Sequence, residues 1–187
     1  CRSSGDDGPT FEGNFAIADF AIAGLSPEVY PAVAGLEDVL NTESDALETL
    51  ISLALTQGKF TASEARGAFA IAGGTARLGN LIIEGMGARL AGSLNLVLEN
   101  LGLNGSFVMT PLNFTDQSGL VETDTARIIA SIGGTLPAPV VQFDLADIVA
   151  AIQVRANELE VDRLEALRAE DEARQRAAAE ERNRLIE

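Results

Sequence analysis

Residues able to do chemistry are sparse in this sequence. The 187 residues include no histidine, and the single cysteine is Cys1. This composition rules out Ser-His-Asp and Cys-His arrangements, His-ligated metal sites and internal disulfides. Asp144 and Asp147 would share one helix face, but two carboxylates alone make no metal or acid–base site, and Asp144 is better explained as an acidic charge at a helix start. We therefore predict a protein that is not an enzyme, with no catalytic residue, no metal site and no cofactor.

The charge of the chain limits its partners. The sequence holds 28 acidic and 13 basic residues, a formal net charge of −15 at pH 7. Nucleic-acid backbones bind clustered lysine and arginine, so we expect no nucleic-acid partner. The longest uncharged runs, 100–115 and 128–143, contain glycine and proline and are too short to cross a bilayer.

Two stretches of the chain, 67–111 and 11–25, have the pattern of β-strands. Apolar and polar residues alternate along both, and glycines such as Gly73-Gly74 occupy the expected turns. The apolar phase slips across Gly79-Asn80, which predicts a β-bulge, and it changes again at Ala18-Asp19. These patterns predict an antiparallel β-meander with one apolar face.

The apolar face of this predicted sheet is the main candidate for function. If helices or a second sheet cover it, it is an ordinary core. If it is open, it is a groove that holds hydrocarbon, because each buried methylene contributes ~0.8 kcal/mol. The residues alone leave both interpretations open. The candidate groove residues are Phe15, Ile17, Phe69, Ile71, Leu90, Leu94, Leu96, Leu98, Phe107 and Met109.

A short repeat links the two stretches. The tetrapeptide Phe-Ala-Ile-Ala occurs at 15–18 and at 69–72, and a glycine precedes each copy by two residues, at Gly13 and Gly67. This repeat predicts a duplicated hairpin.

A helical insertion of about 27–57 separates the strands. Pro31 disfavours a helix through its position, so we predict a first helix from Pro31 to about Leu40. Thr42 fits the N-cap of a second helix that ends at Gly58. These two short helices are expected to cover one end of the sheet.

The chain after the central strands divides into a loop, two strands and a helix. Residues 116–126 are polar and predict a loop, and 127–143 predict two edge strands around Gly133-Gly134, because Pro137 and Pro139 disfavour a central strand. From Asp144 onward the pattern is helical.

The end of the chain, 153–187, predicts a charged helical tail. Its apolar positions thin out towards Leu167, while pairs such as Glu170–Arg174 and Glu172–Arg176 have the favourable i,i+4 order. No heptad repeat persists over three repeats, so we predict a solvated helix and not a coiled coil. The alternative is a helix that binds a partner protein.

The start of the chain, 1–10, is polar and rich in glycine and serine, which predicts a flexible linker. Cys1 has two interpretations. It is either a fragment boundary without meaning, or the lipidated first residue of a mature bacterial lipoprotein.

Two segments resemble a known family. Residues 69–96, with Leu81-Ile-Ile83 and Ala88-Arg-Leu90-Ala-Gly92, and the segment 134–144 are similar to the C-terminal region of AsmA-like proteins, the relatives of AsmA, TamB and YhdP. The similarity covers about 60–152, with a fainter echo at 11–25. Two departures are the Gly73-Gly74 turn, where the family usually has Asp-Gly, and Asn95, where it usually has Asp.

The resemblance implies a fold and a role. It implies a mainly β protein with helices (α+β), in which 11–152 form the β-rich domain, a curved β-meander with a hydrophobic β-groove. It also implies a cell-envelope protein of Gram-negative bacteria that lies in the periplasm, attached to the inner membrane through an N-terminal anchor missing from this chain or, alternatively, through a lipidated Cys1. The implied function is phospholipid transport between inner and outer membrane, a part of outer membrane biogenesis. The alternative is a structural or assembly factor that affects protein targeting to the outer membrane and binds an envelope partner through the C-terminal helix, with the apolar face as an ordinary core.

Overall fold

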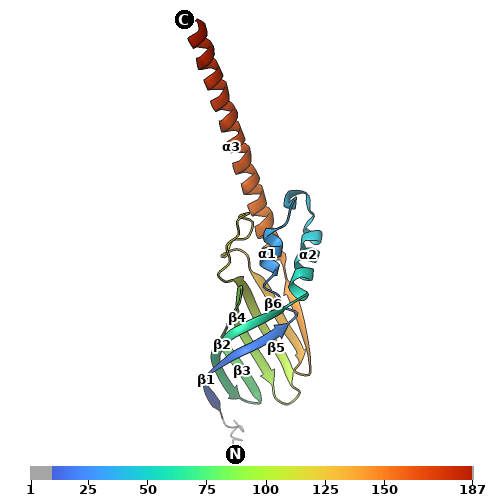
Figure 1. The fold of residues 1–187 in the computed structure, drawn as a ribbon. Helices are drawn as coiled ribbons and strands as arrows, with labels where there is room; N and C mark the ends of the chain where they lie inside the picture. Colours follow the sequence, from blue (N-terminus) through green and yellow to red (C-terminus); the bar gives the residue numbers. More distant parts are fainter. Residues whose placement is uncertain (1–9, 187) are drawn as a thin grey trace, which may run out of the picture.

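A seven-stranded antiparallel sheet forms the body of the protein, and helices lie at one of its ends (Figure 1). The computed structural model describes residues 10–186. The candidate lipidation site Cys1 and nearly all of the predicted linker lie outside these residues. The strands are β1 (Phe11–Ala23), β2 (Lys59–Ala72), β3 (Thr75–Gly85), β4 (Ala88–Val97), β5 (Gly102–Pro111), β6 (Ile128–Thr135) and β7 (Ala138–Asp144). The helices are α1 (Val29–Ala34), the 3-10 helix η1 (Val39–Asn41), α2 (Ser44–Thr56) and α3 (Ala146–Ile186).

The sheet is an open, curved meander. Each strand pairs antiparallel with the next, in the order β1 to β7, so that β1 and β7 are the two edges. The curvature carries β1 and β2 across the front of the later strands in Figure 1. The predicted fold class, a mainly β arrangement with short helices at one end and a long C-terminal helix, is confirmed.

Bulges occur where the apolar phase slips. Pairing between β3 and β4 jumps from Leu78–Leu94 to Leu81–Gly92, and Asn80 has a φ of 49°, in the left-handed region that asparagine tolerates. Asp19 of β1 also has a left-handed φ, 56°, but the pairing of β1 with β2 keeps one register across it. The bulge in β3 returns apolar side chains to the same face of the sheet, which keeps that face continuous.

The two copies of the repeat lie against each other. Gly13 pairs with Phe69, and Phe15 pairs with Gly67, so each glycine is opposite the ring of the other copy. A Cβ atom on Gly13 would be 2.9 Å from Phe69 Cε1, and one on Gly67 would be 3.2 Å from Phe15 Cε1. The predicted duplicated hairpin is therefore wrong. The two copies instead lie on the paired strands β1 and β2, because β1 is followed by helices and not by a hairpin turn.

The hydrophobic core lies at the helical end of the sheet. Helices α1 and α2 and the first turns of α3 cover the apolar face there. Side chains from the helices and from the ends of five strands are buried together. The largest of those that are fully buried are Tyr30, Leu47, Ile51, Leu55, Phe60, Met109, Ile128, Ile148 and Ile152.

The short helices differ in detail from the prediction. Helix α1 begins at Val29 and includes Pro31, because a proline in the first turn sacrifices no intrahelical hydrogen bond. Glu43, and not Thr42, is the N-cap of α2, since the Thr42 hydroxyl donates a hydrogen bond to the Asp38 carbonyl oxygen instead.

Strand β6 is not an edge strand, in contrast to the prediction. It pairs with β5 and with β7, and Gly133-Gly134 lies inside it. The turn is at Leu136-Pro137, and Pro139 lies in the true edge strand β7. Both prolines therefore follow β6, and Pro139 lies in an edge strand, where proline is tolerated.

Helix α3 projects away from the sheet (Figure 1). Its buried residues end at Ala156, and every residue from 161 to 185 is exposed. The packed part thus extends beyond the predicted domain boundary at 152/153, which falls inside one continuous helix. Ion pairs Glu170–Arg174 and Glu172–Arg176 lie on the projecting part at 3.3 and 3.0 Å.

Deletion of residues 169–187 is expected to leave the domain folded. The described part of this segment touches no core residue, and exposed ion pairs contribute only ~0.3–0.5 kcal/mol each. Thermal unfolding followed by circular dichroism should give a midpoint within a few degrees of the full chain. A clearly lower midpoint would show that the tail packs on the body.

Candidate functional site: an apolar trough

The concave face of the sheet is an apolar trough. The register places Leu90 opposite Met109, Leu94 opposite Gly105 and Leu96 opposite Leu103, all on one face, because side chains alternate along a strand. Pairing through β2 and β3 puts Phe69 and Ile71 on the same face, and pairing with β2 adds Phe15 and Ile17. Leu98 follows the end of β4. The structure therefore brings the candidate groove residues together on one surface.

Burial along this trough changes steeply from one end to the other. At the helical end Leu90 is only 3% exposed, and Phe107 and Met109 are buried as well. These three residues belong to the hydrophobic core, a correction to their assignment as groove lining, because their side chains are closed off from solvent. Leu94 and Leu96 are half-buried.

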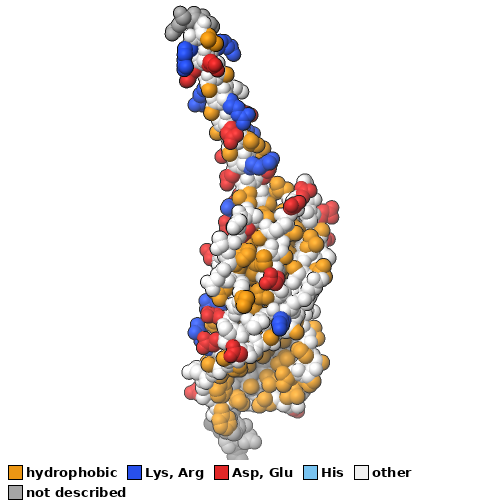
Figure 2. All heavy atoms as spheres, in the orientation of Figure 1, with side chains coloured by type: hydrophobic (Ala, Val, Ile, Leu, Met, Phe, Trp, Pro, Cys, Tyr) orange, Lys and Arg blue, Asp and Glu red, His pale blue; other side chains and the backbone are white. Residues whose placement is uncertain are grey.

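The other candidate residues lie towards the open end. Phe15, Phe69 and Ile71 are half-buried, while Ile17 is exposed and Leu98 is 44% exposed. Figure 2 shows hydrophobic side chains gathered at this end of the body, whereas acidic and basic side chains alternate along α3. The open half of the trough therefore presents apolar surface to solvent.

A small cavity marks the closed end of the trough. It has a volume of about 90 Å³ and is lined by apolar side chains of both edge strands and of the strands between them. Ile22 of β1 faces Val141 and Phe143 of β7 across it, although β1 and β7 are not hydrogen-bonded neighbours. The edges of the sheet thus approach each other near the helices.

Several trough residues were missed by the sequence analysis. Val141, Leu136 and Leu101 are exposed apolar residues in or beside the later strands. The alternation of Ile128, Ala130 and Ile132 was an available signal for a central strand, but the two prolines obscured it.

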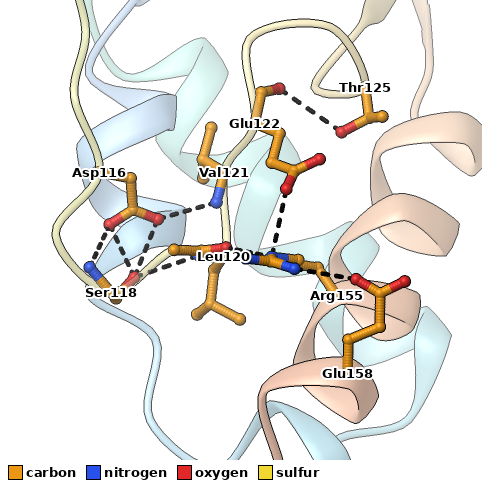
Figure 3. A network of polar contacts seen from close by, with 9 residues as sticks. Asp116, Ser118, Leu120, Val121, Glu122, Thr125, Arg155 and Glu158 are labelled. Carbon is orange, nitrogen blue, oxygen red and sulfur yellow. Dashed lines mark hydrogen bonds and ion pairs between the residues drawn. The ribbon is translucent and has the colours of Figure 1, made fainter. Parts of the chain in front are cut away.

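The most connected polar cluster has a structural role (Figure 3). The Asp116 carboxylate accepts hydrogen bonds from the Ser118 amide at 2.7 Å and the Val121 amide at 2.8 Å, which closes the loop between β5 and β6. Arg155 of α3 donates to the Gly119 carbonyl oxygen at 2.9 Å and pairs with Glu122 at 3.3 Å. This cluster ties the loop to α3.

The same loop also contacts the core. The Phe114 ring lies 6.3 Å from the Tyr30 ring, centroid to centroid. Burial raises the pKa of the Tyr30 hydroxyl well above its usual value, so the group stays neutral. Asp144, the last residue of β7, lies two residues before the first residue of α3, and its Oδ1 accepts a hydrogen bond from the Ala146 amide at 3.1 Å, as predicted for a helix-start carboxylate.

Asp116→Asn is expected to lower the free energy of unfolding by on the order of 1 kcal/mol, or Tm by roughly 2–4 °C. The loss is small because solvent screens this partly exposed carboxylate. Burial alone would raise the pKa of Asp116, but the hydrogen bonds from Ser118 and Val121 outweigh it and lower the pKa. A lowered pKa stabilises the fold above the unfolded value, about 3.9, and this contribution is lost as pH falls below it. Melting curves of both proteins should therefore differ at pH 7 and approach each other as the pH falls below about 3.9. A difference that does not change with pH would contradict the charge-based explanation.

Within residues 10–186, no group of three or more acidic, cysteine or histidine side chains lies in an arrangement that could hold a metal ion. No helix in this part of the chain is long and apolar enough to cross a membrane.

Comparisons with protein-family models, with curated proteins and with solved structures found no match to this chain.

Proposed function

We propose that this protein binds the acyl chains of a phospholipid in the open half of the trough and performs no catalysis. The observation that carries the proposal is the continuity of the apolar face. It runs from the core, at Leu90, through half-buried Leu94 and Leu96 to exposed Leu98 on one strand and the turn after it. An ordinary core would end in polar residues where it meets solvent, whereas this face stays apolar.

The expected affinity suits reversible binding. About ten buried methylenes would contribute roughly 8 kcal/mol at ~0.8 kcal/mol each. Loss of translational and rotational freedom costs at least about 4 kcal/mol. The remainder corresponds to weak binding, which allows a lipid to be released again. No specific contact to the chain is needed, so the trough would accept acyl chains of different lengths.

The proposed setting is the envelope of a Gram-negative bacterium, with the domain in the periplasm as an AsmA-like module for phospholipid transport between the two membranes. The resemblance of residues 69–96 and 134–144 to that family supports this setting. Attachment to the inner membrane through an N-terminal anchor, or through a lipidated Cys1, belongs to the same proposal.

A second candidate function is a structural or assembly factor for outer-membrane proteins. The projecting part of α3 favours it, because all of residues 161–185 are exposed and open to an envelope partner. In this alternative the trough is only a core with an unusually exposed end.

Leu94→Asp is expected to weaken binding of a fluorescent fatty acid at least tenfold, since it places a carboxylate in the open half of the trough. Val97→Asp is the matched control, because Val97 lies on the same strand, on the opposite face, and is also accessible. Fluorescence titration of the three proteins measures the difference. Equal binding by the wild type and Leu94→Asp, or equal loss in both variants, would contradict a site in the trough.

A further inference from the structure

The tips of the hairpins at the open end of the trough carry exposed leucines. Leu98 and Leu101 flank the β4–β5 turn, and Leu136 occupies the β6–β7 turn. Leu101 is 39% exposed and Leu136 is 54% exposed. Phe11, at the start of β1, pairs with Ile71 near the β2–β3 turn and is exposed as well. We call these four residues, Phe11, Leu98, Leu101 and Leu136, the apolar rim.

One turn of the apolar rim, between β4 and β5, has an unusual residue at a turn position. Glycine, asparagine, aspartate, proline and serine dominate such positions. Leu101 instead adopts a φ of 57°, in the left-handed region that disfavours a leucine. A strained leucine that keeps 39% of its surface exposed gains little from folding, so its side chain is better explained by a contact outside the chain.

The apolar rim is one connected surface. The Leu98 amide donates a hydrogen bond to the Gly74 carbonyl oxygen at 2.8 Å, which joins the β4–β5 turn to the β2–β3 turn. The Leu136 amide donates to the Leu101 carbonyl oxygen, also at 2.8 Å, which joins the β6–β7 turn. The three tips therefore present their side chains as a unit at the mouth of the trough.

Charge and the proposed ligand identify the occupant of this surface. The turn residues 73–74, 98–101 and 136–137 include a single charged residue, Glu99, and no lysine or arginine, in a chain of net charge −15. Such a surface has no attraction for anionic lipid headgroups. Exposure of acyl chains to water is unfavourable, which favours their binding in the trough. It also keeps the concentration of free phospholipid in water low, so the trough must be loaded from a bilayer.

We propose that the apolar rim inserts into the surface of a zwitterionic phospholipid bilayer and so places the mouth of the trough against the lipid. This inference rests on the proposed function for its ligand. The rim provides the apolar side chains that enter the headgroup region, and α3 points away from it at the opposite end of the molecule (Figure 1).

The test is flotation of the full chain with phosphatidylcholine vesicles. The variant is Leu101→Asn with Leu136→Asn. Asparagine tolerates the left-handed conformation at 101, so the fold is expected to be at least as stable as the wild type. The matched control is Leu50→Asn with Leu53→Asn, since these α2 leucines are similarly exposed, at 46% and 52%, but distant from the rim. We expect the wild type and the control to float, and the rim variant to lose at least fivefold in bound fraction. Addition of phosphatidylglycerol should weaken wild-type binding.

Several results would overturn the inference. They are a wild type that does not float, a rim variant that floats like the wild type, and a control that loses as much as the rim variant. Light scattering that shows rim-dependent dimers, without vesicle binding, would assign the surface to a second copy of the chain. Leu94→Asp separates this inference from the proposed function, because it should still float while it loses the fluorescent fatty acid. If the rim inference alone is wrong, fatty-acid binding persists without flotation.

Discussion

Leu90→Asp is expected to unfold the protein. The Leu90 side chain is almost fully buried and lines the apolar cavity between the edge strands. A carboxylate there finds no polar partner, and burial of an unpaired charge or of a neutral acid costs several kcal/mol. Loss of the leucine itself costs about 2–5 kcal/mol more. The sum approaches the whole stability of a typical domain, about 5–15 kcal/mol. Circular dichroism should show no cooperative melt, or one that is lower by tens of degrees.

Leu94→Asp is the control for this prediction. It lies on the same strand and the same face, four residues nearer the open end, and is half-buried. Its carboxylate can reach water, so the fold should persist with a modest loss of stability. If both variants unfold, the trough is sealed at Leu94 as well. If neither unfolds, the core does not lie where we place it.

Gly92→Ala is expected to be the most damaging small substitution in the sheet. A Cβ atom on Gly92 would collide with the Ser106 carbonyl oxygen and would be 2.8 Å from Phe107 Cα. Backbone atoms of a paired strand cannot move aside as the end of a side chain can. The expected loss is about 3 kcal/mol, at the upper end of the usual range for overpacking. Urea denaturation measures it as a lower midpoint with an unchanged slope.

Gly133→Ala provides the comparison. Gly133 lies within β6, and nothing lies within 4 Å of a Cβ atom placed there. Alanine also lowers the conformational entropy of the unfolded chain relative to glycine, which favours the folded state where the backbone is extended. Its stability should therefore equal or slightly exceed that of the wild type. Equal losses in the two variants would show that close approach of β4 and β5 is not the cause.

The strands could be predicted from the sequence because their signal is local. Alternation with a period of two is visible in residues such as Leu90, Leu94 and Leu96, and a bulge is visible as a slip in that phase at Gly79-Asn80. The apolar face and the meander follow from these patterns and from the short connections.

The depth of each residue in the trough could not be predicted. Leu90 and Leu96 are the same residue type in the same alternation, yet only Leu90 is buried, in a core to which helices and strands distant in sequence contribute. The residue that pairs with Phe15 across the sheet could not be predicted either, because pairing between β1 and β2 spans the whole helical insertion. Burial and long-range pairing are tertiary properties, and a local pattern does not contain them.

The start of α1 and the place of β6 were missed for a related reason. Both predictions assumed that a proline disrupts a helix or strand, without regard to its position within the element. Pro31 lies in a first turn and Pro137 in a hairpin turn, where a missing N–H group costs nothing.

Site-specific photo-crosslinking tests the central claim, that the trough binds acyl chains, most directly. A photoreactive amino acid is placed at position 96 or at position 97 of the full chain, in the presence of a dissolved fatty acid and without vesicles, so that contact of the apolar rim with a bilayer adds no crosslinks. These adjacent residues lie on opposite faces of β4, so they share strand, depth along the sheet and distance from the open end. Mass spectrometry after irradiation should find the fatty acid attached at position 96 and little or none at position 97. Equal attachment at both positions, or none at position 96, would contradict an acyl-binding trough.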